Sequence, residues 1–422
     1  MPGVTITRRG AERLRAGHPW VYRSEILAIQ PEDRPAGFAP VHEGNGREEH
    51  GSLLGTALFN PDSEIVLRLL SPTEIDSEEE ILALLKERLR RAIALRRAQR
   101  GEDFVRERNP ERDSERDWER DWAGRLVFSE ADALPGLIVD QYGELVMVQI
   151  ASRALDTAAV RAAIVEVLVE ELAPATILER PSPRIRELEQ LSTLPSAVLY
   201  SQGEPQMGST FLLNGLRFHF DAETGQKTGA FLDQRENYAA AARYARGRAL
   251  DVCTYQGGFA LHMARACAQV TGVDISRAAL EVAEQNLAAN RAALGASEVE
   301  WVEANAFDLL RDWSDAGTQY DTIVLDPPAF AKSKRAVEGA VRGYKEMNLR
   351  ALRMLASGGR LITNSCSHHV SLADFTEVVR AAASDARRRV RLLECRGAAA
   401  DHPVILNIPE TEYLKCLILE VE

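Results

Sequence analysis

The fold is decided by the stretch Arg248-Ala-Leu-Asp-Val-Cys-Thr-Tyr-Gln-Gly-Gly258, in which a short apolar run ends in polar residues and two glycines. A strand, a glycine-containing turn and a helix open a βαβ unit, and such a turn lets a ligand approach the backbone closely. The same rhythm continues to the C-terminus and predicts an α/β fold with a mostly parallel, doubly wound sheet. Its strands are expected at 248–252, 269–273, 299–302, 322–325, 360–364, 390–394 and 414–421.

Two regions with other patterns precede this sheet. Residues 1–72 carry short apolar runs between Gly, Pro and Asn, which is typical of a small β-rich domain, and we expect 34–50 to be an exposed loop within it. Residues 73–222 combine a long helical pattern with strands and an amphipathic helix at 154–171, as in a helical connector followed by a central α+β domain. The third domain then covers 223–422.

Composition bounds the class of protein. The chain has 422 residues, 45% hydrophobic and 27% charged, with a net charge of −12, which is ordinary for a globular protein and argues against one that coats nucleic acid. A local basic surface is still present in the sequence, because Arg8, Arg9, Arg13 and Arg15 lie close together. We expect these arginines to contact RNA phosphates, with a purely structural role for the domain as the alternative.

The sequence also indicates a compartment. Five cysteines without framework spacing favour a reducing environment. The N-terminus lacks the apolar core of a signal peptide, and no run approaches eighteen apolar residues, so no membrane partner is expected. We therefore expect a cytoplasmic protein.

Acidic residues end the first two predicted strands of the sheet. Asp251 closes the first strand and Asp274 closes the second. An acid at the end of the second strand can bind both hydroxyls of a ribose. These two features alone would also suit NAD.

The turn between strand and helix favours a different nucleoside. It reads Thr-Tyr-Gln-Gly-Gly and not G-x-G-x-x-G, and Tyr255 and Gln256 stand where a pyrophosphate would need bare backbone. A nucleoside without phosphates fits better, and S-adenosylmethionine is the common one. Asp251 would then face the cofactor amine, and Asn305, after the third strand, could bind the adenine amino group. The expected cofactor-binding residues of the strand ends and the turn are Asp251, Thr254, Tyr255, Gly257, Gly258, Asp274 and Asn305.

Reactive side chains follow the fourth and fifth predicted strands. Asp326-Pro-Pro328 closes the fourth, and Cys366 follows Leu361-Ile-Thr-Asn-Ser365. Ligands bind outside the carboxyl ends of strands in an open α/β sheet, so both side chains are expected in one crevice. C5 of a pyrimidine is a poor nucleophile, and its methylation needs a thiolate that adds at C6 and an acid near N3. Cys366 and Asp326 fit those roles, and a helix start following Cys366 would lower the pKa of the thiol.

The remaining thiols and the neighbouring histidines have plainer interpretations. Free cysteine is usually a small buried hydrophobe, which is the interpretation for Cys267, Cys395 and Cys416 and, less firmly, for Cys253 in the cofactor turn. Cys366 with the adjacent His368 and His369 could suggest a metal site or a Cys–His hydrolase. No second Cys/His pair has suitable spacing, and adjacent residues seldom form a working dyad, so no metal is expected.

With these residues in place, the chain resembles the bacterial 23S rRNA (cytosine-C5) methyltransferases of the RlmI type over nearly its whole length. The motifs that carry the resemblance occur in order along the sequence. They are His18-Pro-Trp-Val-Tyr22, Leu134-Pro-Gly-Leu-Ile-Val-Asp140, Thr228-Gly-Ala-Phe-Leu-Asp-Gln-Arg235, Leu325-Asp-Pro-Pro-Ala-Phe330, Ser365-Cys-Ser367 and Ala400-Asp-His-Pro403.

The resemblance implies an N-terminal PUA domain, a central α+β domain and a C-terminal class I methyltransferase domain with a Rossmann-like sheet. It implies S-adenosylmethionine as donor and, as acceptor, 23S rRNA or a large-subunit precursor, with cytosine 1962 as the target in bacterial relatives. Carried onto this sequence, Cys366 is the nucleophile and Asp326 the acid that grips cytosine. Gln234 and Arg235 would line the cofactor or base pocket. The oligomeric state stays open, a homodimer included.

Two rival functions and three departures from the family pattern remain. An enzyme of the same fold that methylates a guanine or an exocyclic amine of rRNA would keep Asp-Pro-Pro without needing Cys366. A non-catalytic RNA-binding protein with a PUA domain is the other rival. His368 and His369 stand where a glycine is usual, and Asn305 where an Asp is common. No cysteine follows Asp326-Pro-Pro328, so the base that removes the C5 proton is not identified.

Overall fold

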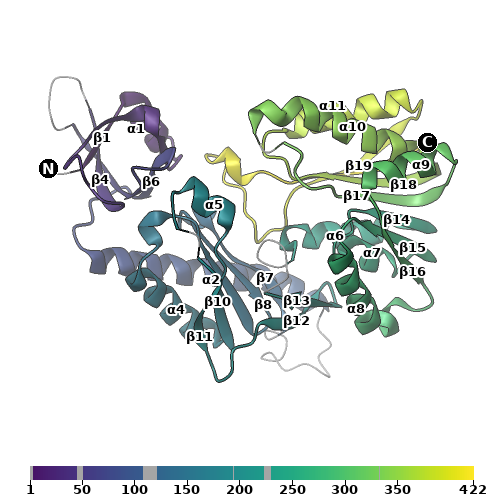
Figure 1. Cartoon of the computed structure of the whole chain (residues 1–422), viewed down its shortest axis with the longest axis horizontal. Helices are drawn as coiled ribbons and strands as arrows, with labels where there is room; N and C mark the ends of the chain where they lie inside the picture. Colours follow the sequence, from purple (N-terminus) through teal and green to yellow (C-terminus); the bar gives the residue numbers. More distant parts are fainter. Residues whose placement is uncertain (1–2, 45–50, 108–120, 193, 223–229, 332) are drawn as a thin grey trace. The chain divides into compact units, whose positions relative to one another are not determined.

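The computed structural model describes residues 3–44, 51–107, 121–192, 194–222, 230–331 and 333–422 (Figure 1). The predicted motif that begins at Thr228 therefore lies partly outside the described residues. The chain forms two compact units, and both are discontinuous in sequence. Unit 1 comprises Met1–Phe211, Phe220–Ala230 and Ala400–Thr411, and unit 2 comprises Leu212–His219, Phe231–Ala399 and Glu412–Glu422.

The N-terminal part of unit 1 is a six-stranded sheet with the strand order β2-β6-β5-β4-β1-β3. Its core contains apolar side chains from the strands and two from the helix α1 (Arg8–Arg15), namely Ala11 and Leu14. Thr7 caps that helix by accepting a hydrogen bond from the backbone N–H of Gly10. The strands are β1 (Val4–Ile6), β2 (Trp20–Tyr22), β3 (Ile26–Ile29), β4 (Gly37–Glu43), β5 (Leu53–Phe59) and β6 (Ile65–Ser71).

The loop expected at 34–50 is wrong where the structure describes it, because β4 occupies much of that stretch. Ala39 and Val41 alternate into the core with no exposed surface, while β4 pairs with β5 on one side and with β1 on the other. Glycine and proline in this segment suggested a turn, but burial on one face and pairing on both edges favour a strand. Residues 45–50 lie outside the part of the chain that the structure describes.

The middle of unit 1 is a five-stranded sheet, in the order β11-β10-β9-β8-β7, whose core includes side chains of two long helices. The helices are α2 (Glu78–Glu107) and α4 (Ala158–Leu172), and a short helix α5 (Pro183–Leu188) follows. The predicted start of α4 at 154 is too early, because Thr157 caps the helix by accepting from Val160 N–H. The strands are β7 (Ala123–Phe128), β8 (Leu137–Tyr142), β9 (Leu145–Ile150), β10 (Thr176–Glu179) and β11 (Ala197–Ser201).

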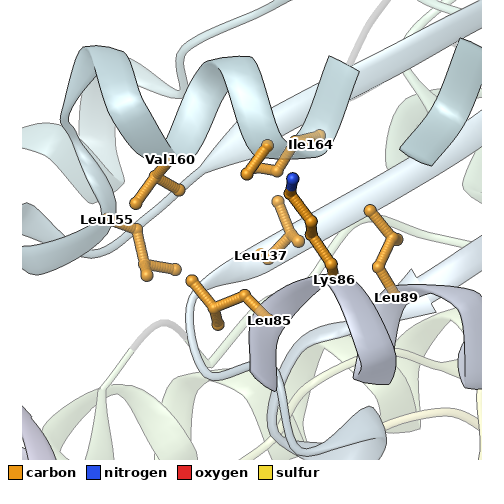
Figure 2. Close-up of a pocket in the computed structure, with 8 residues that line it drawn as sticks. Leu85, Lys86, Leu89, Leu137, Leu155, Val160 and Ile164 are labelled. Carbon is orange, nitrogen blue, oxygen red and sulfur yellow. The ribbon is translucent and has the colours of Figure 1, made fainter. Parts of the chain in front are cut away.

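A small cavity lies between α2 and α4 (Figure 2). Its volume is about 10 Å³, at the lower limit for one water molecule. Apolar side chains such as Leu85, Leu137 and Val160 line it, and the ammonium of Lys86 at its rim binds Glu166. The cavity is therefore a packing gap in the core and not a substrate site.

Unit 2 is built on a seven-stranded sheet with the order β16-β15-β14-β17-β18-β20-β19, in which β20 is antiparallel to both of its neighbours. This confirms the mostly parallel, doubly wound sheet. A separate hairpin, β12 (Gly208–Leu213) and β13 (Leu216–Asp221), precedes it. The sheet strands are β14 (Arg248–Val252), β15 (Gln269–Asp274), β16 (Glu298–Glu303), β17 (Tyr320–Leu325), β18 (Leu355–Ser365), β19 (Val390–Arg396) and β20 (Lys415–Val421).

Helices cover both faces of this sheet, with α10 and α11 together on one face and α6, α7 and α8 on the other (Figure 1). Three of them begin at positions that matter for the site: α6 at Arg235, α7 at Gly258 and α11 at Leu372. No helix in the described part of the chain is long and apolar enough to cross a membrane. The helices of unit 2 are α6 (Arg235–Tyr244), α7 (Gly258–Met263), α8 (Arg277–Leu294), α9 (Ala306–Asp315), α10 (Val337–Met354) and α11 (Leu372–Asp385).

Candidate active site

The turn after β14 has an unusual backbone. Cys253, Tyr255 and Gly257 have φ values of 65°, 51° and 85°, all in the left-handed region, which is costly for residues other than glycine. The backbone N–H of Tyr255 is held by the carboxylate of Asp274 at 2.9 Å, so part of this strain is offset by a charged hydrogen bond. The predicted turn residues Thr254, Tyr255, Gly257 and Gly258 therefore form one constrained loop between β14 and α7.

Asp251 is fully buried beneath this loop. Its Oδ2 accepts hydrogen bonds from the hydroxyl of Thr254 at 2.6 Å and from the N–H of Ala260 at 2.9 Å. Its Oδ1 has no hydrogen-bond partner among the described residues. Burial raises the pKa of Asp251 to about 7, and the nearby negative charge of Asp274 adds to the increase. A buried carboxylate oxygen without a partner is suited to a positively charged ligand group.

Asp274 ends β15 and is half-buried. Its Oδ2 accepts from Tyr255 N–H and its Oδ1 from Ser276 N–H, each at 2.9 Å. Each carboxylate oxygen still has a lone pair, so both can accept further bonds from vicinal hydroxyls. The two backbone donors fix the carboxylate orientation before any ligand arrives. These features fit a ribose, and together with Asp251 they fit S-adenosylmethionine.

Asn305 serves a local role that the sequence did not indicate. Its side-chain oxygen caps α9 by accepting from the N–H of Phe307 at 2.9 Å and of Asp308 at 3.4 Å. The adenine contact proposed for this residue would have to use the same side chain, and it stays a prediction. Nearby, Ile275 is 69% exposed directly after Asp274, and Phe307 is also exposed. Sequence reasoning missed these two apolar side chains, although an apolar residue directly after a ligand-binding acid is a usable signal.

Asp326 is held in place by a chain of amides from the start of α6. Gln234 donates from Nε2 to Asp326 Oδ1 at 2.9 Å, and its own Oε1 accepts from Asn237 at 2.7 Å. Arg396 in turn donates to Asn237 Oδ1 at 3.0 Å. Gln234 is 2% exposed, so its amide has little access to water. The predicted residue Arg235 begins α6, and its carbonyl accepts from the side chain of Asn214.

Cys366 lies beside the Asp-Pro-Pro segment, as the sequence predicted. β17 and β18 are parallel neighbours in which Leu325 pairs with Thr363, so both chains leave the sheet at the same edge. The Cys366 thiol donates to the carbonyl oxygen of Pro327, with an S···O distance of 3.8 Å. Cys366 is only half-buried.

A helix follows Cys366, as expected, but it does not begin at the thiol. α11 begins at Leu372, and its first turn is closed by a capping box in which Ser371 and Asp374 bond each other. The effect of a helix N-terminus falls off within its first turn, and the Asp374 carboxylate at this end is already engaged with Ser371, so α11 supplies little positive field at Cys366. The Ser367 that follows the thiol is instead held by Tyr344, whose hydroxyl lies 2.8 Å from Ser367 Oγ, and by Lys415.

Lys415 is the residue of this site that sequence reasoning missed. It is 3% exposed, and its ammonium donates to the carbonyl oxygens of Ser367 at 2.7 Å and Tyr413 at 2.8 Å. Burial lowers the pKa of Lys415 to about 8, while the negative charges of Cys366 and Glu412 act in the opposite direction. A single lysine within the apolar run that precedes the C-terminus was the available signal, because lysine is almost never fully buried without partners.

The other cysteines differ from Cys366. Cys267 and Cys416 are buried, as predicted, and burial raises the pKa of Cys267 to about 12. Burial and the carboxylates of Asp274 and Asp326 raise the pKa of Cys253 well above its usual value. The prediction for Cys395 is wrong: it is exposed, because β19 is the edge strand of the sheet.

The arginines near the N-terminus form a basic face on α1, but they are engaged in ion pairs. Arg8 binds Glu12 at 2.9 Å, and Arg13 binds the buried Glu25 at 2.5 Å. Arg9 lies 3.9 Å from Glu25, and Arg15 lies 2.5 Å from Glu43. Arg8 and Arg9 have side chains that are 81% and 85% exposed, so these two are the most available for a phosphate.

Two family models match the chain. One is described as an S-adenosylmethionine-dependent methyltransferase and matches residues 159–396, and the other as a PUA-like domain and matches residues 4–72. Among solved structures, a protein described as a methyltransferase in complex with SAH is similar at a TM-score of 0.78 and 18% identity, with both chains fully covered. A protein described as an S-adenosylmethionine-dependent methyltransferase from Streptococcus mutans gives 0.77 at 18% identity, also with full coverage. These two likenesses concern the fold.

Curated relatives match over nearly the whole chain, and all three described here are named ribosomal RNA large subunit methyltransferase I. The protein from Shewanella frigidimarina is 35% identical, covering 98% of each chain. That from Shewanella denitrificans is 36% identical with the same coverage, and that from Erwinia tasmaniensis is 34% identical, covering 97% of each chain.

Proposed function

Because the chain belongs to the ribosomal RNA large subunit methyltransferase I family of S-adenosylmethionine-dependent methyltransferases, we propose that it forms 5-methylcytosine in 23S rRNA through a covalent adduct of Cys366. The methyl donor follows from the family. The acceptor base and the covalent route are the proposal. The observation that carries it is the half-buried Cys366, whose thiol contacts the carbonyl of Pro327 in the Asp326-Pro-Pro328 segment, where two adjacent parallel strands end.

The chemistry of C5 explains why both groups are needed. The Cys366 thiolate forms a bond to C6, and the electron pair of the C5–C6 double bond becomes available at C5. Asp326, in its protonated form, donates a proton to N3, where the negative charge would otherwise accumulate, and takes it back when the adduct breaks down. S-adenosylmethionine, when bound, supplies the methyl group that C5 receives. Loss of the C5 proton to a base then restores the double bond, and the Sγ–C6 bond breaks to return the thiolate.

Asp251 and Asp274 are the residues we propose to hold the cofactor. The unpartnered Oδ1 of Asp251 suits the cofactor's ammonium, and the preoriented carboxylate of Asp274 suits the ribose hydroxyls. Exposed Ile275 and Phe307 offer apolar surface for the adenine. The loop from Thr254 to Gly258 lies between β14 and α7, and its left-handed backbone allows a ligand to approach closely.

The test is to trap the adduct. RNA containing 5-fluorocytosine at the target should remain covalently bound to the enzyme, because fluorine replaces the proton that must leave. Cys366→Ala should abolish both trapping and methyl transfer while binding S-adenosylmethionine as the parent protein does. Cys395→Ala is the matched control, because that thiol is exposed but lies on the edge strand β19. Methyl transfer by Cys366→Ala at a rate close to the parent's would reject the covalent route and favour an amine or guanine acceptor.

Asp326→Asn tests the second half of the proposal. The amide cannot carry the negative charge or exchange the proton required at N3, so turnover should fall by at least about a hundredfold, the range for a lost acid–base group. Gln234 should keep its position, because an Asn oxygen can still accept its hydrogen bond. Mass spectrometry of the methylated RNA reports both the amount and the identity of the modified base.

A further inference from the structure

The loop that carries Cys366 is attached to a buried lysine from the far end of the chain. Lys415 begins β20, and its pairing partner across the antiparallel ladder is Ser365, the residue before the thiol. Its ammonium donates to the carbonyl of Ser367, the residue after the thiol. Lys415 therefore contacts the residue before Cys366 and the residue after it.

We propose that Lys415 is a positioning residue that fixes the Cys366 loop and supplies the positive charge that stabilises the thiolate. This inference rests on the proposed function of Cys366 as nucleophile. It also supplies a positive charge closer to the thiol than the N-terminus of α11, which begins only at Leu372.

The charged and titratable groups around the thiol come from several elements. Asp326 follows β17, and in its ionised form it has the same sign as a thiolate. From the segment before β20, Glu412 is a further acid near Lys415. From α10, Tyr344 bonds Ser367 through its hydroxyl, and burial raises the pKa of that hydroxyl, so it stays neutral. His368 lies on the same loop and stacks on Tyr413.

The coupling between thiolate and ammonium is reciprocal. The negative charge of Cys366 raises the pKa of Lys415, although the larger effect of burial lowers it. The interaction energy between two charges is shared, so the Lys415 ammonium stabilises the Cys366 thiolate by the same amount. Two carbonyl acceptors, from Ser367 and Tyr413, hold the ammonium in place while it is desolvated. A cation that is buried and hydrogen-bonded acts more strongly on a neighbouring charge than one in water.

The direct test measures the Cys366 thiolate without RNA or cofactor. The full chain is alkylated with iodoacetamide from pH 6 to 10, and mass spectrometry follows the Cys366 peptide alone. In the parent protein the rate should rise with an inflection below 8.5, the value of an ordinary cysteine. An inflection at or above that value in the parent overturns the proposal, whatever the variants do.

Variants then separate charge from hydrogen bonding. Lys415→Met removes both, while Lys415→Gln keeps a donor for the Ser367 carbonyl without the charge. Each should raise the inflection by about 1 to 3 pH units and slow alkylation at pH 7 by about tenfold or more, as expected when an adjacent opposite charge is lost. Arg391→Met is the matched control, because it removes a cation from β19 that binds Glu420 and Glu422.

The outcomes distinguish this inference from the function on which it rests. An unmoved inflection in a folded Lys415→Met or Lys415→Gln protein rejects the role of Lys415, even if Cys366 proves to be the nucleophile. Raised inflections together with an active Cys366→Ala enzyme would instead reject the proposed function. Lys415→Arg should restore a low inflection, because it keeps the charge.

Discussion

The side-chain amide of Gln234 donates to Asp326 Oδ1 at 2.9 Å and is itself held by Asn237. This bond joins the start of α6 to the end of β17 and fixes which way the carboxylate turns. Its consequence is that the Asp326 carboxylate can meet a substrate without first losing freedom of rotation. Orientation of this kind lowers the barrier because the geometry is set before the reaction.

Gln234→Leu should therefore lower turnover while leaving S-adenosylmethionine affinity within about twofold of the parent's. Loss of one bond to a charged, half-buried group costs about 1–3 kcal/mol, which is about tenfold to a hundredfold in rate. Steady-state methyl transfer and calorimetric titration measure the two quantities separately. A change confined to cofactor affinity would show that Gln234 serves the cofactor and not the carboxylate.

Asp251 should make cofactor binding depend on pH. Its pKa is raised to about 7 by burial, and a positively charged amine binds the ionised form. The apparent affinity for S-adenosylmethionine should then increase by about tenfold from pH 6 to pH 8, following the ionised fraction. Asp251→Asn should bind more weakly and without this dependence, and titration calorimetry at several pH values is the measurement. An affinity that decreases over this range would contradict the assignment.

The same group affects stability with a definite sign. The folded pKa of Asp251 lies above the usual value of 3.8, so the folded state binds more protons than the unfolded state between those two values. The stability of the ligand-free protein should therefore decrease, through this group, as pH rises from about 4 to about 7 and level off above it. Thermal melting of the parent and Asp251→Asn proteins checks this, and Asp312→Asn on the exposed face of α9 is the control.

Asp274→Ala should weaken S-adenosylmethionine binding by about 1–3 kcal/mol, the usual cost of leaving hydrogen-bonding groups without partners. The loss has two sources, the ribose contacts and the freed N–H of Tyr255 in the constrained loop. Glu303→Ala, at the end of the next strand β16, removes an exposed acid and should change little. Tight NAD binding without S-adenosylmethionine binding would overturn the cofactor assignment.

The arginines of α1 should separate into two kinds. Replacing Arg8 and Arg9 with Glu should weaken RNA binding and flatten its salt dependence by about one unit of slope per lost phosphate contact. Arg13→Ala should instead lower the melting temperature, because it leaves Glu25 buried without its 2.5 Å partner. Filter binding at several salt concentrations and calorimetric melting measure these effects. Unchanged RNA affinity in the Arg8/Arg9 variant would favour a purely structural role for the N-terminal domain, residues 1–72.

Much of unit 2 could be predicted from periodicity. The first strand, 248–252, and the helix at 277–294 appear in the structure with the same limits as β14 and α8. Cys366 and Asp326 could be paired because parallel strands end at the same edge of a sheet, a consequence of connectivity alone. The domain limits at 72 and 222 stay predictions, since the two compact units follow a different division.

The rest depended on contacts between residues distant in sequence. The bond from Lys415 to Ser367 and the exposure of Cys395 follow from the order β18-β20-β19, which local patterns do not encode. The strand β4 was missed because its glycine and proline suggested a loop. The alternation of buried and exposed side chains that marks it as a strand is clear only once its pairing with β5 is known. The role of a polar residue inside an apolar run, such as Lys415, becomes clear only when the groups that it contacts are known.

Residues 400–411 belong to unit 1, although nearly the whole of unit 2 precedes them in the chain. There Asp401 accepts the backbone N–H of Arg125 at 2.9 Å, and its carbonyl accepts from the buried Arg96. During translation, a growing chain that has produced all of β7 and α2 still lacks these partners. Domains generally fold as units from the N-terminus, but unit 1 of this protein cannot form these two hydrogen bonds until Asp401 has been synthesised. Unit 1 therefore reaches its full set of contacts only after the residues of unit 2 up to Ala399 have been added to the chain.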